Sequence, residues 1–447
     1  MNKTNYFINH LETLSNSDLD KNVLLQAKRT FLDYLGVTIA GSFLQRKNFY
    51  DLVDKTNGSK STPLLGMGQY SNIHQAAFIN GFHAHLIELD DGHRFGMLHL
   101  AAYIYSALIS IASITNISWS AFFKGAVCGY EAAVKLARLI QPTHKLRGYH
   151  ATGTCGTVGA SVAVCYALGY QKVQIKSSIA AAMTSSAGLL EMIDNSSEFK
   201  PYNVGRAAMD GLQAALVGKV GLTPPKDPLG GKRGFIKTLS GLDLTENDFE
   251  AVFAADLPEI MNIYFKPYAA CRHCHPVIEA SIKLSKKISD IKNIKNINVE
   301  TYDLAIYGHD HKEITGTSSA KMSIGYSLAS ALLRGKSDIE SFNDRNIKKT
   351  IKSGLIDIIQ ISEKNEYSVM NPDARPAKVI IELKDGTSLS EFVLQPKGEP
   401  ENPLTNEDIV AKVNFLFVLA NRKNTKEVID NVLNLKLDPI KIVEMCV

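Results

Sequence analysis

The chain has 447 residues, of which 45% are hydrophobic and 21% are charged, and its net charge is +4. This length is enough for two domains and a large core, and the composition is that of an ordinary globular protein. Its lysines are scattered, and no Lys/Arg run with interleaved aromatic residues occurs, so the charge gives no argument for a nucleic-acid partner.

Neither a secretory signal nor a membrane span is predicted. The first twenty residues contain no apolar signal-peptide core. The longest apolar stretches, 101–114 and 177–190, are shorter than the ~20 residues that a membrane span needs. The six cysteines are too scattered for a disulfide framework. We therefore expect a cytoplasmic protein that does not bind membranes.

The first half of the chain has the apolar spacing of helices, separated by a loop or short extended piece at 61–68. These helices are rich in Ala, Gly and Ser, which suits a closely packed all-helical bundle. They are predicted at 22–40, 72–86, 101–114, 118–140, 157–168 and 173–190.

The glycines at 153 and 156 precede the helix predicted at 157–168, and Gly159 lies at its start. Their spacing does not fit a dinucleotide-binding motif, and no strand pattern comes before them. We interpret the stretch from Gly153 to Gly156 as a loop leading into a helix N-terminus, whose free N–H groups can hold a carboxylate.

The character changes beyond about residue 265. The segment 222–235 is predicted to be a loop, and a further helix is predicted at 246–253. Residues 297–307 have a β-like pattern, and 377–394 form the strongest hairpin pattern, with Asp385–Gly386 at its turn. Helical patterns at 276–288 and 320–333 lie between these strands, so a smaller α+β domain is predicted. After about residue 402 the pattern is helical again and can rejoin the first domain.

The segment 80–101 concentrates polar chemistry between two apolar segments. If it is helical, Glu88 shares a face with His85 and with Asp91. Gly92 is expected to end that helix, so that the next residues project from a turn. The alternative is a solvated helix end with satisfied histidines. The ionisable side chains of the segment are His83, His85, Glu88, Asp90, Asp91, His93, Arg94 and His99.

Three further clusters contain residue types that a site would use. They are Arg147 with His150, Lys200 before Pro201, and the segment 266–275 with Lys266, Tyr268, Cys271, Arg272, His273 and His275; Tyr326 lies in an otherwise apolar helix. Lysine, arginine and histidine on separate segments suit an anionic substrate with more than one carboxylate. Proton transfer at a carbon beside a carboxylate needs a base, and it needs cations to stabilise the enediolate-like charge. No metal or cofactor motif is evident, so side chains and helix N-termini are expected to supply that charge.

Two other interpretations apply to the cysteine-containing cluster. Cys271, His273, Cys274 and His275 offer zinc-ligand atoms, although structural zinc usually takes two separated ligand pairs. Cysteine nucleophile chemistry needs a base beside Cys271, and His275 is four residues further on.

The same segments resemble the MmgE/PrpD family, which includes 2-methylcitrate dehydratase, cis-aconitate decarboxylase and iminodisuccinate epimerase. The resemblance runs nearly from end to end. It depends on the segments FLDYLGVTIAGS, NGFHAHLIELDDGHR, RGYHATGTCGTVGAS, FKPYNVGRAA, PLGGKRGF, KPYAACRHCHP and AKMSIGYSLA, in this order.

The resemblance implies a mainly α protein in which both chain ends build a large all-helical domain, residues 1–264 and 401–447. A smaller α+β lid domain, residues 265–400, is inserted between them, with the active site in the cleft. It also implies a homodimer and a small carboxylate substrate.

The resemblance also implies the site residues. Asp91 takes the last Asp of the family's D-F-D-D-T motif, and Glu88 stands at its leading Asp. His99 matches the His of the following H-P-S. Positions that match the family's His, Lys and Tyr site residues are His150, Lys200 and Tyr326. Cys271 falls where decarboxylases carry a His, and His275 matches a second His. The chain departs from the family pattern at Glu88, Gly92, Leu100 and Cys271.

Our hypothesis is a cofactor-independent lyase, first of all a 2-methylcitrate dehydratase-like hydro-lyase, with an epimerase or a decarboxylase as alternatives. Lys200 and Arg94 would hold carboxylates, and His150 and His99 would exchange protons. Asp91 would orient an imidazole, and Tyr326 would complete the lid side. The substrate-binding set also includes Glu88, Cys271, Arg272 and His275. The rival from another class is a scaffold that binds a metabolite without converting it.

Overall fold

The computed structural model describes residues 1–447 except 46–48, 51, 54–59, 193–196 and 255–256. It is 58% helix and 9% strand, which confirms the prediction of a mainly α protein with a small sheet. Among the described residues, none of the helices has the length and apolarity to span a membrane.

The helical part is built around α8 (Ala151–Ala167), which is buried almost throughout. This helix packs against α5 (Ala101–Ala112), α6 (Trp119–Ile140), α9 (Lys172–Ser185) and α10 (Lys200–Gly218). The predicted loop at Gly153–Gly156 was wrong, because both glycines lie inside α8. A Cβ on Gly153 would come 2.4 Å from the carbonyl oxygen of Ala187, and one on Gly156 would come 2.7 Å from the Tyr103 ring. These glycines therefore serve close packing and do not form a loop.

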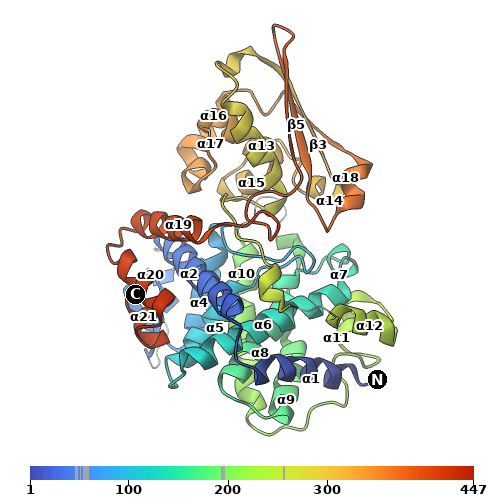
Figure 1. The fold of residues 1–447 in the computed structure, drawn as a ribbon, viewed down its shortest axis with the longest axis vertical. Coiled ribbons are helices and arrows are strands. Elements are labelled where there is room, and N and C mark those ends of the chain that lie inside the picture. Colours follow the sequence, from blue (N-terminus) through green and yellow to red (C-terminus); the bar gives the residue numbers. More distant parts are fainter. Residues whose placement is uncertain (46–48, 51, 54–59, 193–196, 255–256) are drawn as a thin grey trace.

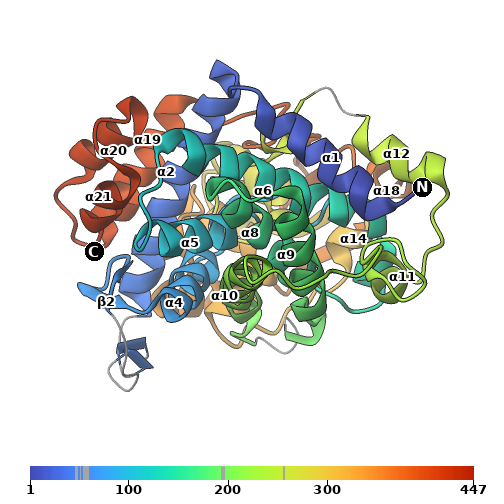
Figure 2. The same cartoon turned by 90° about the horizontal axis from the view of Figure 1, so that it is seen from below.

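Both ends of the chain contribute to this helical part. Helix α2 (Lys21–Leu44) packs on α4 (Ile73–Leu86), and the C-terminal helices α19 (Asn406–Leu419) and α20 (Thr425–Asn434) pack on α2. Figures 1 and 2 both show these first and last helices side by side. The remaining elements of this part are α1 (Lys3–Asn16), β1 (Thr62–Leu64), β2 (Gln69–Ser71), α7 (Thr143–Leu146), α11 (Phe235–Ser240), α12 (Glu246–Phe253) and α21 (Pro439–Glu444).

Local sequence explains several helix boundaries. Asn72 caps α4 by accepting from the N–H of Gln75, and Ser118 caps α6 by accepting from the N–H of Ala121. Thr405 and the third helical residue of α19 form a reciprocal capping box. The starts of α4 and α6 agree with the predicted helices to within one residue, and α19 begins about four residues after the predicted point.

Residues 265–400, which we call the lid segment, contain a four-stranded sheet in the order β4-β3-β5-β6. Strand β3 (Ile294–Thr301) pairs in parallel with β4 (Ile359–Glu363) and antiparallel with β5 (Ala377–Leu383). The predicted hairpin of β5 and β6 (Ser388–Val393) is present, with Gly386 at φ 91° in its turn. Strand β4 was missed, because it is short and only its first residue is buried.

Helices of the lid segment pack on the part of this sheet formed by β5 and β6. Helix α13 (His275–Ser285) packs on β5, β6 and α16 (Ile324–Arg334). The other helices of the lid segment are α14 (Asp303–Ile306), α15 (Thr317–Met322), α17 (Asp344–Lys352) and α18 (Asn365–Met370). Figure 1 shows these elements grouped at one end of the molecule, beyond the helical part. The domain boundaries at 264/265 and 400/401 stay a prediction.

Candidate active site

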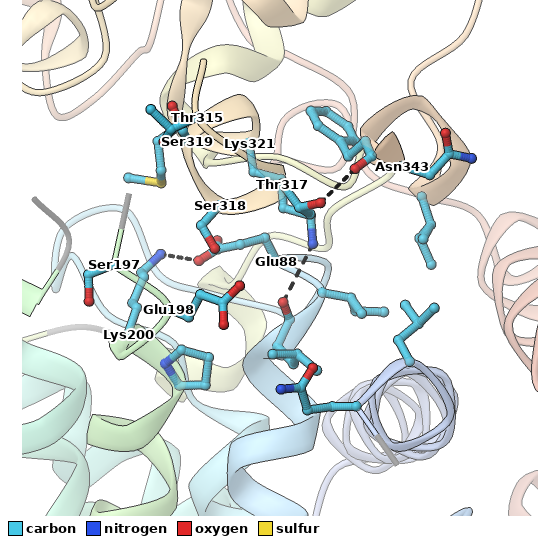
Figure 3. A pocket seen from close by; sticks show the side chains of 18 of the residues that line it. Glu88, Ser197, Glu198, Lys200, Thr315, Thr317, Ser318, Ser319, Lys321 and Asn343 are labelled. Carbon is cyan, nitrogen blue, oxygen red and sulfur yellow. Dashed lines mark hydrogen bonds and ion pairs between the residues drawn. The ribbon is translucent and has the colours of Figure 1, made fainter. Parts of the chain in front are cut away.

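A cleft of about 840 Å³ lies where the helical part meets the lid segment. One wall comes from the C-terminal end of α4 and the N-terminal end of α10, and the other from residues 308–322 and 339–344. Figure 3 shows Glu88, Lys200 and Lys321 around the same space, with the hydroxyl groups of Thr317 and Ser318 nearby. The volume is in the range of small-molecule sites.

Glu88 lines the cleft just beyond α4, which ends at Leu86 as the prediction of a helix at 72–86 had it and does not continue to Gly92. The helix stops at Leu86, and Glu88 adopts φ 56°, a left-handed conformation that is uncommon for a residue other than glycine. The predicted helical face shared by Glu88 and Asp91 was therefore wrong. The Glu88 carboxylate forms ion pairs with Lys200 and with Lys266, the latter at 3.0 Å. Lys266 also donates to the Glu88 carbonyl oxygen at 3.2 Å, so contacts from the lid segment hold this backbone conformation.

The cleft lysines differ in how they are compensated. Burial raises the pKa of Glu88, but Lys200 and Lys266 outweigh it and hold that pKa well below its usual range. Among the described residues, the Lys321 ammonium has one polar contact, with the carbonyl oxygen of Leu86 at 3.5 Å. Burial and the repulsion of the other two lysines lower the pKa of Lys321 to about 8. Sequence reasoning missed Lys321, although its segment AKMSIGYSLA carries a family motif.

Two imidazoles on the helical side share one carboxylate. His85 Nδ1 lies 2.8 Å and His99 Nδ1 lies 3.3 Å from Asp90 Oδ2, and the two rings are 4.4 Å apart between centroids. His99 Nδ1 also lies 2.7 Å from the carbonyl oxygen of Asp91, so it carries the proton in the neutral ring. Burial lowers the pKa of His99 to about 4. His99 is therefore a neutral imidazole near pH 7.

The Asp91 carboxylate has a different task from the one predicted. It accepts hydrogen bonds from the N–H groups of Leu100 and Ala101, at 3.3 and 2.9 Å, and from the Tyr130 hydroxyl at 2.6 Å. It thus accepts hydrogen bonds from N–H groups at the start of α5 that have no acceptor within the helix. The carboxylate that contacts the imidazoles belongs to Asp90, while Asp91 touches His99 only through its carbonyl oxygen.

His150 lies immediately before α8, on the same side as Lys200. Its Nδ1 accepts a hydrogen bond from the Asn203 side chain at 3.1 Å, so the neutral ring carries its proton on Nε2. Burial, and then the charge of Lys200, hold the pKa of His150 well below its usual range; the charges of His85 and His99 add to the effect. Lys200, His150 and His99 are thus brought into one electrostatic neighbourhood.

Of the ten predicted site residues, Glu88 and Lys200 line the cleft, and the other eight lie outside its lining: Asp91, Arg94, His99, His150, Cys271, Arg272, His275 and Tyr326. Arg94 forms a bidentate ion pair with Glu401 and lies 3.5 Å from Glu399. Arg272 contacts Glu399 at 2.9 Å and His275 Nδ1 at 2.8 Å, and His275 Nε2 lies 3.1 Å from the carbonyl oxygen of Ala270. None of Arg94, Arg272, His275 and Tyr326 lines the cleft.

Tyr326 is buried in the lid segment. Its hydroxyl donates to the carbonyl oxygen of Ser341 at 2.5 Å, and its ring packs against Phe342. In this structure the Tyr326 hydroxyl is therefore engaged by the backbone.

Cys271 has a base beside it, but that base is His309 and not His275. Cys271 Sγ lies 3.1 Å from His309 Nε2, and the N–H of Cys271 donates to the carbonyl oxygen of Lys321 at 2.9 Å. His309 was not considered in the sequence because it is 38 residues from Cys271. Only the lid fold brings the two together.

The proposed zinc ligands at 271–275 have separate partners. His273 Nδ1 lies 2.6 Å from the Tyr302 hydroxyl, and His275 is paired with Arg272. Within the described part of the chain, the side chains that approach a metal-ligating geometry are instead His85, Asp90 and His99, whose ligand atoms lie within 4.8 Å of one another. Those atoms are joined by hydrogen bonds or close contacts, as in a carboxylate shared by two imidazoles.

Gly92 shows why one departure from the family motif is tolerated here. Its backbone exchanges two hydrogen bonds with Tyr264, at 3.1 and 2.8 Å. A Cβ at this position would come 2.4 Å from the Tyr264 hydroxyl oxygen. The absence of a side chain at Gly92 therefore fits the tyrosine that faces it.

Comparison with known proteins agrees with this architecture. The MmgE/PrpD N-terminal domain matches residues 6–247, and the MmgE/PrpD C-terminal domain matches residues 268–435. The chain belongs to the MmgE/PrpD family, as its motifs predicted.

Several relatives align over nearly the whole chain. A cis-aconitate decarboxylase-like protein, oryM, of Aspergillus oryzae is 24% identical, with 92% of this chain and 89% of the relative covered. A cis-aconitate decarboxylase of Aspergillus terreus is 25% identical, with 94% and 91% covered. The cis-aconitate decarboxylase of Mus musculus is 23% identical, with 91% and 85% covered.

Proposed function

We propose that this protein is a lyase that acts on a small di- or tricarboxylate bound in the cleft. The observation that carries the proposal is that Lys200 and Lys321 line the cleft, while the neutral imidazoles His150 and His99 lie close enough for the charges of Lys200 and Lys266 to lower their pKa values. Cations and proton-transfer groups near one another are what carbanion chemistry beside a carboxylate requires.

The less exposed charges at the cleft favour an anionic substrate, although the exposed carboxylates of Glu198, Asp310, Glu313 and Asp344 also line it. Among the described residues, Lys200, Lys266 and Lys321 lie near one buried glutamate, Glu88, and Asp90 is shared between two imidazoles. Buried cations without matching anions are costly unless a ligand compensates them. A substrate carboxylate beside Lys200 or Lys321 would provide that compensation.

The hydrogen bonds of the two imidazoles suggest distinct roles. His99 keeps its proton on Nδ1, so its Nε2 has a free electron pair and can act as a base. His150 receives a hydrogen bond on Nδ1, so its Nε2–H can donate to a substrate carboxylate or to a leaving group. Both pKa values are lowered, which keeps the rings neutral and available near pH 7.

The relatives give an order in which to test reactions. Those with the printed name cis-aconitate decarboxylase make loss of carbon dioxide the first candidate, ahead of the dehydration that the sequence motifs had favoured. In decarboxylation the C–C bond to one carboxylate breaks, its electron pair moves toward the neighbouring unsaturated carboxylate system, and a proton is delivered to carbon. The lysines would stabilise the charge in that intermediate.

The experiment is a substrate panel of cis-aconitate, 2-methylcitrate and iminodisuccinate, followed by NMR in deuterium oxide. We expect product formation, or deuterium entering at carbon, with one member of the panel. His150→Ala should lower that rate on the order of 10²-fold or more. No exchange and no product with any member would contradict a catalytic function. Binding of a panel member without turnover would indicate a metabolite-binding scaffold instead.

A further inference from the structure

Cys271 and His309 form a dyad directly behind the residues of the lid segment that line the cleft. Their Sγ and Nε2 atoms are 3.1 Å apart. His309 Nδ1 lies 2.8 Å from the carbonyl oxygen of Tyr307, which can only accept a hydrogen bond. The neutral ring therefore carries its proton on Nδ1 and presents the free electron pair of Nε2 to the thiol.

The dyad is attached directly to residues that line the cleft. His309 lies between Gly308 and Asp310, both of which line it, and the backbone N–H of Cys271 is bonded to Lys321. The Cys271 residue is 9% exposed, whereas Cys128, Cys155, Cys165, Cys274 and Cys446 are each 0% exposed. Cys271 is therefore the cysteine with a route to a reagent or a substrate.

The charges around the sulfur favour its ionised form. Lys145, Lys200 and Lys266 act on it as cations, and Glu88 opposes them. The other titratable groups near the pair are His273, whose ring centroid is 5.0 Å from that of His309, Tyr302 and Cys274. Burial raises the pKa of Cys271, but His309 and Lys200 outweigh it and lower that pKa to about 6.

We propose that Cys271 and His309 form a thiolate–imidazolium pair that serves as a second proton-transfer group, contributed by the lid segment to the carboxylate-binding cleft. The proposal rests on the proposed function and extends it, because the helical part already supplies His99 and His150 near the cleft. It gives the substrate a proton-transfer group on each side of the boundary between the two parts of the chain.

The proton balance of the pair is simple. The S–H bond breaks with its electron pair staying on sulfur, and the proton moves to His309 Nε2. The Nδ1–H group of His309 keeps its hydrogen bond to the Tyr307 carbonyl oxygen. The thiolate then accepts a proton from the substrate carbon, whose C–H electron pair enters the enediolate. In the reverse direction the thiol returns that proton to carbon. No oxidant, reductant or covalent intermediate is involved.

The first test does not depend on turnover. The full-length protein is treated with iodoacetamide from pH 5 to pH 10, and labelling of each cysteine is followed by peptide mass spectrometry. Cys271 should react at least about 10-fold faster than any of the other cysteines, because only a thiolate is nucleophilic and the others are enclosed. The rate should be half-maximal near pH 6. In His309→Gln the midpoint should move toward about 8.5, the value of an ordinary thiol.

His273→Gln is the matched control. It removes the neighbouring imidazole, which contacts Tyr302 and not the sulfur, so the midpoint should stay near that of the wild type. Equal labelling of all cysteines in the folded protein would contradict the proposal that Cys271 and His309 form a thiolate–imidazolium pair. So would a labelling rate that is half-maximal in the wild type at a pH equal to or above that of His309→Gln.

The second test asks whether the pair moves protons. With whichever panel substrate the wild type converts, Cys271→Ser should lower kcat on the order of 10²-fold with little change in KM, since a serine hydroxyl keeps the shape but does not ionise. Thermal unfolding of the variant checks that it folds. Normal labelling of the wild type together with full activity of Cys271→Ser would overturn the proton-transfer role. If no panel member is converted, the proposed function fails, but the labelling experiment still shows whether Cys271 and His309 form a thiolate–imidazolium pair.

Discussion

Two groups of charges, most of them buried, lie along the boundary between the lid segment and the helical part and are compensated in opposite ways. The junction cluster consists of Arg94, Arg272, Glu399 and Glu401, in which two guanidinium groups meet two carboxylates. The cleft cluster consists of Glu88, Lys200, Lys266 and Lys321, in which three ammonium groups meet one carboxylate. In the junction cluster the positive and negative groups are equal in number. In the cleft cluster, counted over the described residues, three ammonium groups share one buried carboxylate, and the other carboxylates that line the cleft are exposed.

This difference explains which predicted cations belong to the site. Arginine with its planar fork suits a fixed bidentate pair, and Arg94 forms one with Glu401. Lysine is a compact charge on a flexible stem whose pKa shifts when it is buried, as that of Lys321 does. The junction cluster thus joins the two parts of the chain, whereas the cleft cluster is suited to bind a substrate.

The largest expected effect comes from Lys200→Ala. Loss of this cation should lower kcat/KM on the order of 10²-fold or more, because it removes a charge that stabilises the developing anion. Steady-state kinetics on the panel substrate provides the measurement. Lys172→Ala, at a surface lysine paired with Glu12, is the control and should leave the kinetics unchanged. Equal activity of the two variants would contradict the assignment of substrate binding to the cleft cluster.

Glu88→Gln should reduce stability by about 3 kcal/mol, because two lysines lose their shared buried carboxylate. Urea unfolding measures the difference. The Glu88 pKa is lowered in the folded state, so its contribution is present above its unfolded pKa of about 4.3 and is lost as pH falls toward the folded value. The gap between wild type and variant should therefore narrow below about pH 4. A gap that is absent at pH 7 would mean that the lysines do not need Glu88.

Lys321 should give a pH-dependent effect of roughly 10-fold, the loss of one charged contact of about 1.4 kcal/mol. Its pKa of about 8 means that the ammonium is lost as pH rises through that value, so kcat/KM should fall above pH 8. Lys321→Arg should move this fall to higher pH, because a guanidinium stays charged. Lys321→Met should be weak at every pH and lack the fall. If kcat/KM fell above pH 8 in both variants as it does in the wild type, Lys321 would not be the group whose deprotonation causes the fall.

Arg94→Ala is expected to have the smallest effect on activity. Its amino groups are engaged by Glu401 and Glu399, so kcat/KM should stay near the wild-type value while the urea midpoint falls. This variant separates the sequence-based prediction of Arg94 as a carboxylate ligand from its place in the junction cluster. If Arg94→Ala lost as much activity as Lys200→Ala without losing stability, Arg94 would be a substrate ligand, as the sequence predicted.

Local patterns alone determined much of this protein. Hydrophobic spacing located most of the long helices of the first half, and the Asp385–Gly386 turn located the hairpin. The order of the motifs was sufficient to predict the family. These features follow from interactions between residues close in sequence, or from the 3.6-residue and two-residue periods of buried faces.

Only the tertiary structure decided which polar groups meet. The left-handed Glu88 is held by Lys266, a residue of the lid segment. Asp90 takes the place expected for Asp91, because the Asp91 carboxylate satisfies the start of α5. His309 reaches Cys271 only through the fold of the lid segment. In each case the partner is distant in sequence, and the requirement that buried charges and hydrogen-bonding groups find partners selects it.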